Sequence, residues 1–276
     1  LGGEVPPAWE ETASVLGVDR ILVVDDESND TAPAWSADGQ FVYFLSSRSG
    51  SSQVWRLSPE GGEAQPVTDL PLDVGTFRLS GDGRTLVVSM QVFPDCEELA
   101  CTVARKESLE KEPTSGKSYS QLFMRHWDHW LDDRQTHLFV QAAEAGAEAR
   151  NLLAGTELVA GPGFSGAATL SGNTLNATWA PGGETLIFNA TTNRDQAAHA
   201  RVRFQLYSVP VAGGEPVAIA GGQDWSCTGP QFDDQGEPWD VRQMEWALEV
   251  IRDLNRRSEH GVVLFQFIHG WKSNAA

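Results

Sequence analysis

The stretch that decides the fold is Pro33-Ala-Trp35-Ser-Ala-Asp38-Gly39, in which an aromatic residue, small polar residues and a glycine precede an apolar run. Similar phrases recur at residues 77–83, 177–183 and 230–236. The glycines of the first two copies, Gly39 and Gly83, stand 44 residues apart, which is the length of one four-stranded WD40-like propeller blade. The repeat therefore predicts an all-β protein of the β-propeller class.

Each copy also predicts a β-hairpin. Asp-Gly or Gly-Gly at two central positions supplies the positive φ angles of a type I′ turn, so the strands on either side should pair. The runs that follow the turns are apolar on both faces, which favours strands in the middle of a layered structure. Further strands, with Gly-Gly turns between them, are expected at residues 53–57, 64–68, 204–209 and 216–219.

The number of blades is less clear from the sequence. A strand pair at residues 121–123 and 136–140, joined through Asp132-Asp133, is expected to belong to a blade between the second and third copies. Four or five blades can then be counted, and a closed five-bladed ring would need residues 1–30 to complete the last blade. The alternative is a β-sandwich, but sandwiches do not repeat whole four-strand units.

Charge and hydropathy exclude several classes of function. The chain has 38 acidic and 20 basic residues and a net charge of −18, which repels phosphate backbones and argues against nucleic-acid binding. The sequence contains no run of 18 apolar residues, so no membrane span is predicted. No cofactor is expected, and the oligomeric state cannot be inferred.

Two of the three cysteines, Cys96 and Cys101, lie five residues apart in a segment that resembles a loop leaving the second blade. A short disulfide is the favoured interpretation, and it implies an oxidising compartment such as the bacterial periplasm. The alternative is two free thiols in a cytosolic protein. Zinc is not expected, because no second pair of ligands has suitable spacing. We therefore expect a periplasmic or secreted protein whose leader, if it has one, lies outside this sequence.

Residues 106–120 are polar and predict an exposed excursion between strands. The string that follows contains His126, Asp128 and His129 among two tryptophans. Residues three apart on one strand point to opposite faces, so packing of these rings at a blade edge is favoured over a metal site.

A resemblance becomes specific between residues 92 and 140, which contain Phe93-Pro-Asp-Cys96, Arg125-His-Trp-Asp128 and His137-Leu-Phe-Val140. This region resembles the amino-terminal propeller of prolyl oligopeptidase family serine peptidases, in the bacterial dipeptidyl and acylaminoacyl peptidase branch, and the resemblance extends over about residues 30–236. It implies a propeller of residues 31–237 that caps an α/β-hydrolase domain and admits only peptides to a Ser-Asp-His triad. The implied partner is a peptide substrate.

Some members of that family bind the substrate's amino terminus with two glutamates. Glu97-Glu98 is the candidate pair here. Its position between two cysteines in a loop differs from the helical context of the family's pair, which argues against this role.

No catalytic residue can be assigned. The family's nucleophile lies on a G-x-S-x-G turn, which exposes the serine beside the oxyanion hole. The nearest match, Gly163-Phe-Ser165-Gly166-Ala167, ends in alanine and lies in a glycine-rich stretch, so it predicts a connection. Without this turn, the sequence offers no activated serine that could act as the nucleophile.

In the last forty residues the spacing of the apolar residues changes from that of a strand to that of a helix. Apolar residues from Val241 to Leu254 follow a helical spacing, with Asp240 as N-cap, and a buried strand is predicted at residues 262–268. The next residues, His269, Gly270 and Trp271, resemble the oxyanion loop at the start of an esterase-like α/β-hydrolase domain. Residues 238–276 are thus expected to be a truncated start of that domain.

Three functional hypotheses follow. The chain is the substrate-gating propeller of a prolyl oligopeptidase-type peptidase, inactive alone; or an independent propeller that binds peptide or protein partners, as periplasmic TolB-like propellers do; or part of an esterase. A G-x-S-x-G turn encoded beyond Ala276 would support the first or third hypothesis.

Overall fold

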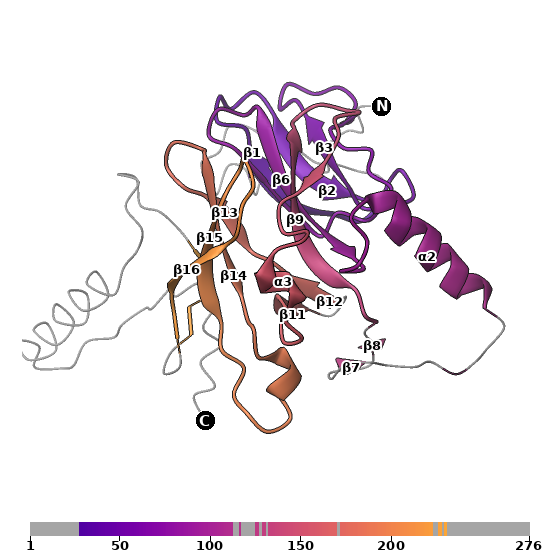
Figure 1. Ribbon diagram of the computed structural model, residues 1–276. Coiled ribbons are helices and arrows are strands. Elements are labelled where there is room, and N and C mark those ends of the chain that lie inside the picture. The colour runs from indigo at the N-terminus through magenta and orange to yellow at the C-terminus, as the bar shows by residue number, and fades with distance from the viewer. Residues whose placement is uncertain are drawn as a thin grey trace, which may run out of the picture. The chain divides into compact units, whose positions relative to one another are not determined.

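The computed structural model describes residues 28–112, 116, 125–126, 129–130, 132–169, 172–222, 226–227 and 229–230 (Figure 1). Three four-stranded antiparallel sheets dominate this part of the chain, and in each sheet the strands lie side by side in the order in which the chain forms them. This is the topology of propeller blades, so the predicted fold class is confirmed. The fourth copy of the repeat after Pro230 and the expected hydrolase segment 238–276 lie outside the described residues, as does most of the expected lead-in 1–30.

Blade 1 consists of β1 (Asp30–Trp35), β2 (Val42–Ser46), β3 (Gln53–Leu57) and β4 (Gln65–Pro66). It belongs to the first of the two compact units into which the chain divides. Residues 43–46 of β2 are all buried, as their apolar run predicts. This blade forms from neighbouring hairpins, and β3 has the bounds that the sequence predicts.

Blade 2 consists of β5 (Thr76–Leu79), β6 (Thr85–Val92), β9 (Gln135–Ala142) and β10 (Arg150–Asn151). β6 and β9 pair along their whole lengths, from Thr85 opposite Ala142 to Val92 opposite Gln135. The expectation that residues 136–140 belong to a separate blade between the second and third copies was therefore wrong. They form the third strand of blade 2, and residues 93–134 are inserted between its second and third strands.

The insertion carries helix α2 (Leu99–Lys111) and the short strands β7 (Arg125–His126) and β8 (His129–Trp130). The polar excursion predicted from residue 106 is thus helical as far as Lys111. Ala, Leu, Glu, Lys and Arg are strong helix formers, and no Gly or Pro interrupts them. Only Thr102 of this helix is buried, which explains why no apolar periodicity revealed it.

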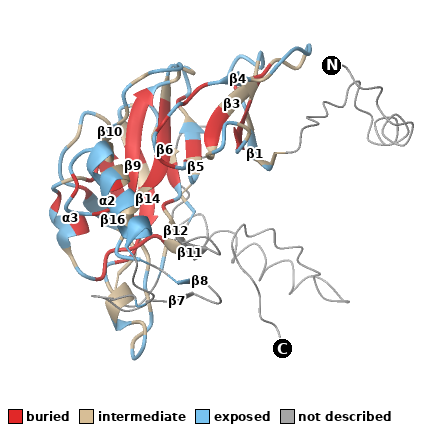
Figure 2. Cartoon of the chain, turned by 90° about the vertical axis from the view of Figure 1, so that its right-hand side faces the viewer, coloured by how far each residue is buried: buried red, intermediate tan, exposed pale blue. Residues whose placement is uncertain are grey.

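Blade 3 consists of β13 (Ala177–Trp179), β14 (Thr185–Ala190), β15 (Gln205–Pro210) and β16 (Val217–Ala220). Between blades 2 and 3 the chain forms α3 (Glu157–Ala160), β11 (Ala167–Thr169) and β12 (Gly172–Thr174), and a 3₁₀ turn, η1 (Arg194–Gln196), follows β14. One apolar core joins both blades to this connection, and Figure 2 shows the buried residues running along β6 and β9. None of the described helices is long and apolar enough to cross a membrane.

The turns between first and second strands differ from the predicted type I′ turns. In blade 2 the N–H of Ser80 donates to the carbonyl of Thr85 at 2.8 Å, and the N–H of Gly83 donates to the carbonyl of Ser80 at 2.9 Å. The loop therefore has four residues, and only Gly83 has a positive φ, +72°. Asp82 accepts hydrogen bonds from the Ser80 hydroxyl at 2.6 Å and the Arg84 N–H at 3.0 Å. The aspartate thus acts as a turn-closing acceptor, and the hydrogen bond from Ser80, followed by that from Arg84, lowers its pKa.

Candidate functional site

The two ends of blades 2 and 3 carry connections of different kinds. At one end, which we call the turn end, short glycine turns join the strands at residues 80–84, 143–149, 180–184 and 211–216. At the other end, the connection end, lie the described parts of residues 93–134, the hairpin β11–β12 and residues 191–204. Functional residues concentrate in long connections held by a rigid scaffold. The connection end is therefore where a functional site should be sought.

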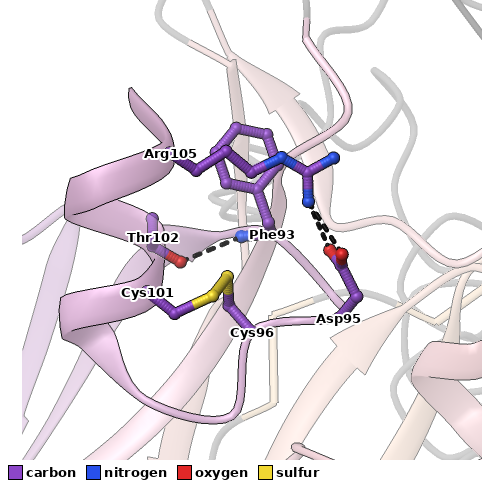
Figure 3. Close-up of a disulfide and its surroundings, with 6 residues drawn as sticks. All are labelled: Phe93, Asp95, Cys96, Cys101, Thr102 and Arg105. Carbon is purple, nitrogen blue, oxygen red and sulfur yellow. Dashed lines mark hydrogen bonds and ion pairs between the residues drawn. A yellow bond between two sulfur atoms is a disulfide. The ribbon is translucent and has the colours of Figure 1, made fainter. Parts of the chain in front are cut away.

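A disulfide between Cys96 and Cys101 fastens the start of α2 to the end of β6, with the two Cα atoms 5.5 Å apart (Figure 3). Cys96 is buried and Cys101 is exposed. Beside the disulfide, the Phe93 N–H donates to the Thr102 hydroxyl at 3.2 Å, and Thr102 is fully buried. The bridge and the hydrogen bond together fix the first turn of the helix.

Arg105 makes the second attachment of α2. One nitrogen of its guanidinium donates to both carboxylate oxygens of Asp95, at 2.7 and 2.8 Å. The same guanidinium lies over the ring of Phe93, 4.2 Å from its centroid (Figure 3), at which distance a cation–π attraction operates. Beyond this point the helix is exposed, and Leu109 is 50% exposed. α2 is therefore an arm that is held firmly at its base.

Glu97 and Glu98 lie inside the disulfide loop, immediately before α2, and both are exposed. Glu98 is the N-cap residue, but its side chain makes no capping hydrogen bond. Neither carboxylate bonds to another residue in the described part of the chain. Two carboxylates on a fixed loop can hold a cationic group such as a peptide amino terminus. The pair borders a helix, although its residues are not themselves helical.

Ser165 does not lie on a nucleophile turn. It is 6% exposed, and it exchanges two backbone hydrogen bonds with Thr191, at 3.0 and 2.9 Å, in an antiparallel bridge. Its hydroxyl donates to the carbonyl of Gly166 at 3.1 Å. The segment is a packed connection between α3 and β11, in agreement with the interpretation from the sequence.

His137 is a buried residue that the sequence analysis named only as part of the string His137-Leu-Phe-Val140, without a role of its own. Its Nδ1 lies 3.0 Å from the Asn151 amide nitrogen and its Nε2 lies 3.3 Å from Gln135 Oε1. Its ring meets the edge of Phe164 at 6.3 Å between centroids. Burial lowers the pKa of His137 to about 4, so the ring is neutral near pH 7. Its burial could not be predicted from the sequence, because a histidine in the strand β9 can face the core or the solvent.

His126 and His129 are on different strands, opposite each other in the β7–β8 hairpin. The argument that they occupy opposite faces of one strand was therefore wrong, because they belong to two paired strands. Trp130 is 56% exposed, which does not fit the expected packing at a blade edge. Within the described ranges, no three His, Cys, Asp or Glu side chains gather where they could hold a metal ion. The expected oxyanion loop, His269 to Trp271, lies outside the described residues.

Sequence comparison relates the chain to peptidases. It is 22% identical over 235 residues to dipeptidyl-peptidase 5 of Porphyromonas gingivalis, a match that covers 82% of this chain and 31% of the relative. It is 26% identical over 124 residues to dipeptidyl-peptidase 5 of Porphyromonas endodontalis, covering 45% of this chain and 17% of the relative. The chain thus spans less than a third of the length of these relatives. No protein-family model matches it.

Among solved structures, a putative TolB from Agrobacterium tumefaciens aligns with 76% of this chain and 52% of its own, at 16% identity and a TM-score of 0.44. The peptidase relatives confirm the resemblance that residues 92–140 suggested.

Proposed function

We propose that the chain, whose sequence resembles the propeller part of prolyl oligopeptidase family peptidases, gates the access of peptides to a catalytic domain and does not itself catalyse hydrolysis. The observation that carries this proposal is the match to dipeptidyl-peptidase 5 over 82% of the chain. The disulfide between Cys96 and Cys101 supports a periplasmic or secreted location, because such bonds persist in oxidising compartments.

The first experiment tests catalysis by the purified chain. A fluorophosphonate probe labels activated serine nucleophiles, and intact mass spectrometry detects the adduct. We expect no adduct, because the sequence has no G-x-S-x-G turn and Ser165 is packed in a bridge. A stoichiometric adduct lost in Ser165→Ala would show that the chain carries its own nucleophile and would overturn the proposal.

A finer proposal places the substrate's amino terminus at Glu97 and Glu98. Both carboxylates are exposed and lack described partners, and the disulfide loop fixes their backbone. The test compares a tetrapeptide that has a free amino terminus with its N-acetylated form in a calorimetric titration. Removing the partners of a bound ammonium costs about 1.4 kcal/mol or more, equal to a tenfold loss of affinity.

The variant is Glu97→Gln with Glu98→Gln, and its control is Glu110→Gln with Glu112→Gln, which removes two exposed charges from the far end of the same arm. We expect the first variant alone to bind the free peptide at least tenfold more weakly and to bind the acetylated peptide unchanged. Equal losses in both variants would show that only the net charge matters and would refute this assignment.

A further inference from the structure

The disulfide encloses the two glutamates to which we assign the amino terminus of a peptide. Glu97 and Glu98 lie in the chain between Cys96 and Cys101, and both are exposed. The backbone turns at each end of this ring, because the Cys96 N–H donates to the carbonyl of Phe93 at 2.9 Å and the Cys101 N–H donates to the carbonyl of Glu98 at 3.1 Å. The bond between the two sulfur atoms therefore fixes the backbone that carries both carboxylates.

Two other contacts join the segment before the ring to the helix after it. Asp95 pairs with Arg105 at 2.7 Å, and the Phe93 N–H donates to the Thr102 hydroxyl at 3.2 Å (Figure 3). Neither contact involves a sulfur atom, so both can persist when the disulfide is reduced. Within the described part of the chain the glutamate side chains have no such attachment, and Glu98 makes no capping hydrogen bond. Reduction should therefore loosen the ring while the base of α2 stays in place.

A reductant can reach this disulfide from the side of Cys101, which is exposed, whereas Cys96 is 4% exposed. A thiolate of a dithiol attacks the Sγ atom of Cys101, forms a mixed disulfide and releases the Sγ atom of Cys96 as a thiolate. The second thiol of the reductant then attacks the reductant's own sulfur in the mixed disulfide and releases Cys101. Two electrons pass to the protein, the two protons of the dithiol end on the two cysteines, and the dithiol leaves as a disulfide. Exposed disulfides are the ones that react readily in this way.

We propose that this disulfide is a redox switch for peptide binding. In the oxidised chain the ring holds Glu97 and Glu98 in position for the ammonium group of a peptide. In the reduced chain the same two residues must be ordered at the moment of binding, which should weaken the affinity at least about tenfold. The switch acts on the binding site proposed above and requires that these glutamates receive the amino terminus. The site is then complete only in a compartment that oxidises the bridge.

Calorimetric titration of the full chain with a tetrapeptide that has a free amino terminus tests the switch. The oxidised chain should bind the peptide at least about tenfold more tightly than the chain reduced with dithiothreitol, and reoxidation should restore the affinity. The double variant Cys96→Ser with Cys101→Ser should bind as weakly as the reduced chain, with or without reductant. Cys227→Ser is the control, because it removes the free cysteine and should respond to reduction like the wild type.

A second measurement reports on the ring without any peptide ligand. A glutamyl endopeptidase cleaves segments that can extend into its active site, and the closed ring prevents such extension. Reduction should therefore raise the rate of cleavage after Glu97 or Glu98 at least about tenfold. Cleavage after Glu107 and Glu110, which are exposed further along α2, should keep its rate.

The possible outcomes separate the switch from the site. Equal affinities of the oxidised and reduced chains, or equal rates of cleavage after Glu97 and Glu98, overturn the switch and leave the assignment of the site intact. A loss of affinity on reduction that also appears with the N-acetylated peptide, or a general loss of the circular dichroism signal, places the effect elsewhere in the chain and overturns the switch as well. If the oxidised chain binds the free and the N-acetylated peptide equally, the site itself is refuted, and the switch with it.

Discussion

Acid should destabilise the fold through His137, because the structure holds this side chain in its neutral form. His137 is 1% exposed. The Asn151 side-chain oxygen accepts the N–H groups of Leu153 and Ala154, at 2.9 and 3.1 Å, so its amide nitrogen is the atom that faces His137 Nδ1. That nitrogen can only donate, and a proton on Nδ1 would therefore meet another N–H in a buried place.

The magnitude follows from the pKa. Burial lowers the pKa of His137 from 6.5 to about 4, and one pKa unit corresponds to about 1.4 kcal/mol. The unfolded chain binds the proton more readily between these two values, so the contribution to stability is complete above pH 6.5 and is lost as the pH falls towards 4. Between pH 7 and pH 4.5 the free energy of unfolding should fall by about 2.5 kcal/mol. Asp38 and Asp82, whose pKa values are lowered from 3.8 by hydrogen bonds from Ser36 and Ser80, titrate below this window.

Urea unfolding of the wild type and of His137→Gln, at a series of pH values, measures this effect. Glutamine retains a donor and an acceptor but does not titrate, so the variant should lose less than about 0.5 kcal/mol over the same pH range. His199→Gln is the control, because His199 is exposed and its replacement should leave the wild-type profile intact. Parallel pH profiles for the wild type and His137→Gln would refute the reasoning.

Two further predictions concern the connection end. Gly163→Ala should lower the free energy of unfolding by about 2–3 kcal/mol, measured by urea unfolding, because a Cβ at this position would lie 2.3 Å from the carbonyl oxygen of Thr192; Gly81→Ala, which meets no atom within 4 Å, is its control. Replacing Cys96 and Cys101 by serine should cost about 2 kcal/mol, because the bridge closes a short loop in the unfolded chain, and reducing agent should shift the urea midpoint of the wild type but not that of the variant.

The outcomes that would contradict these two predictions are distinct. Equal stabilities of Gly163→Ala and Gly81→Ala would mean that residues 161–166 do not pack against the turn after β14. A loss of stability on reduction that persists in the serine variant would assign the effect to a group other than the bridge.

Local pairing explains why blades 1 and 3 could be predicted. Their second and third strands follow each other through short turns, so hydrophobic pattern and turn residues report on the same neighbours. The predicted strand at residues 53–57 has the bounds of β3. Blade 2 could not be predicted in the same way, because its second and third strands, β6 and β9, are separated in the sequence by residues 93–134.

Only part of the candidate site could be predicted from the sequence. The spacing of Cys96 and Cys101 pointed to the disulfide, and the Glu97-Glu98 pair could be picked out as candidates. The anchoring by Arg105 could not be predicted, because its contacts with Asp95 and Phe93 depend on a helix that has no apolar stripe. The predicted turn type was also wrong. Asp38 and Asp82 are residues that tolerate a positive φ, but in this structure they accept hydrogen bonds from the hydroxyls of Ser36 and Ser80.

The sequence by itself determined that this chain builds repeated antiparallel blades, because turn residues and alternating apolar residues act on neighbours within a few positions. Only the tertiary structure decided which strands complete blade 2, that a helical arm stands on a disulfide beside it, and that Ser165 and His137 are buried. These features depend on contacts between segments far apart in the chain, and the free energy of such contacts comes from packing that no local pattern encodes.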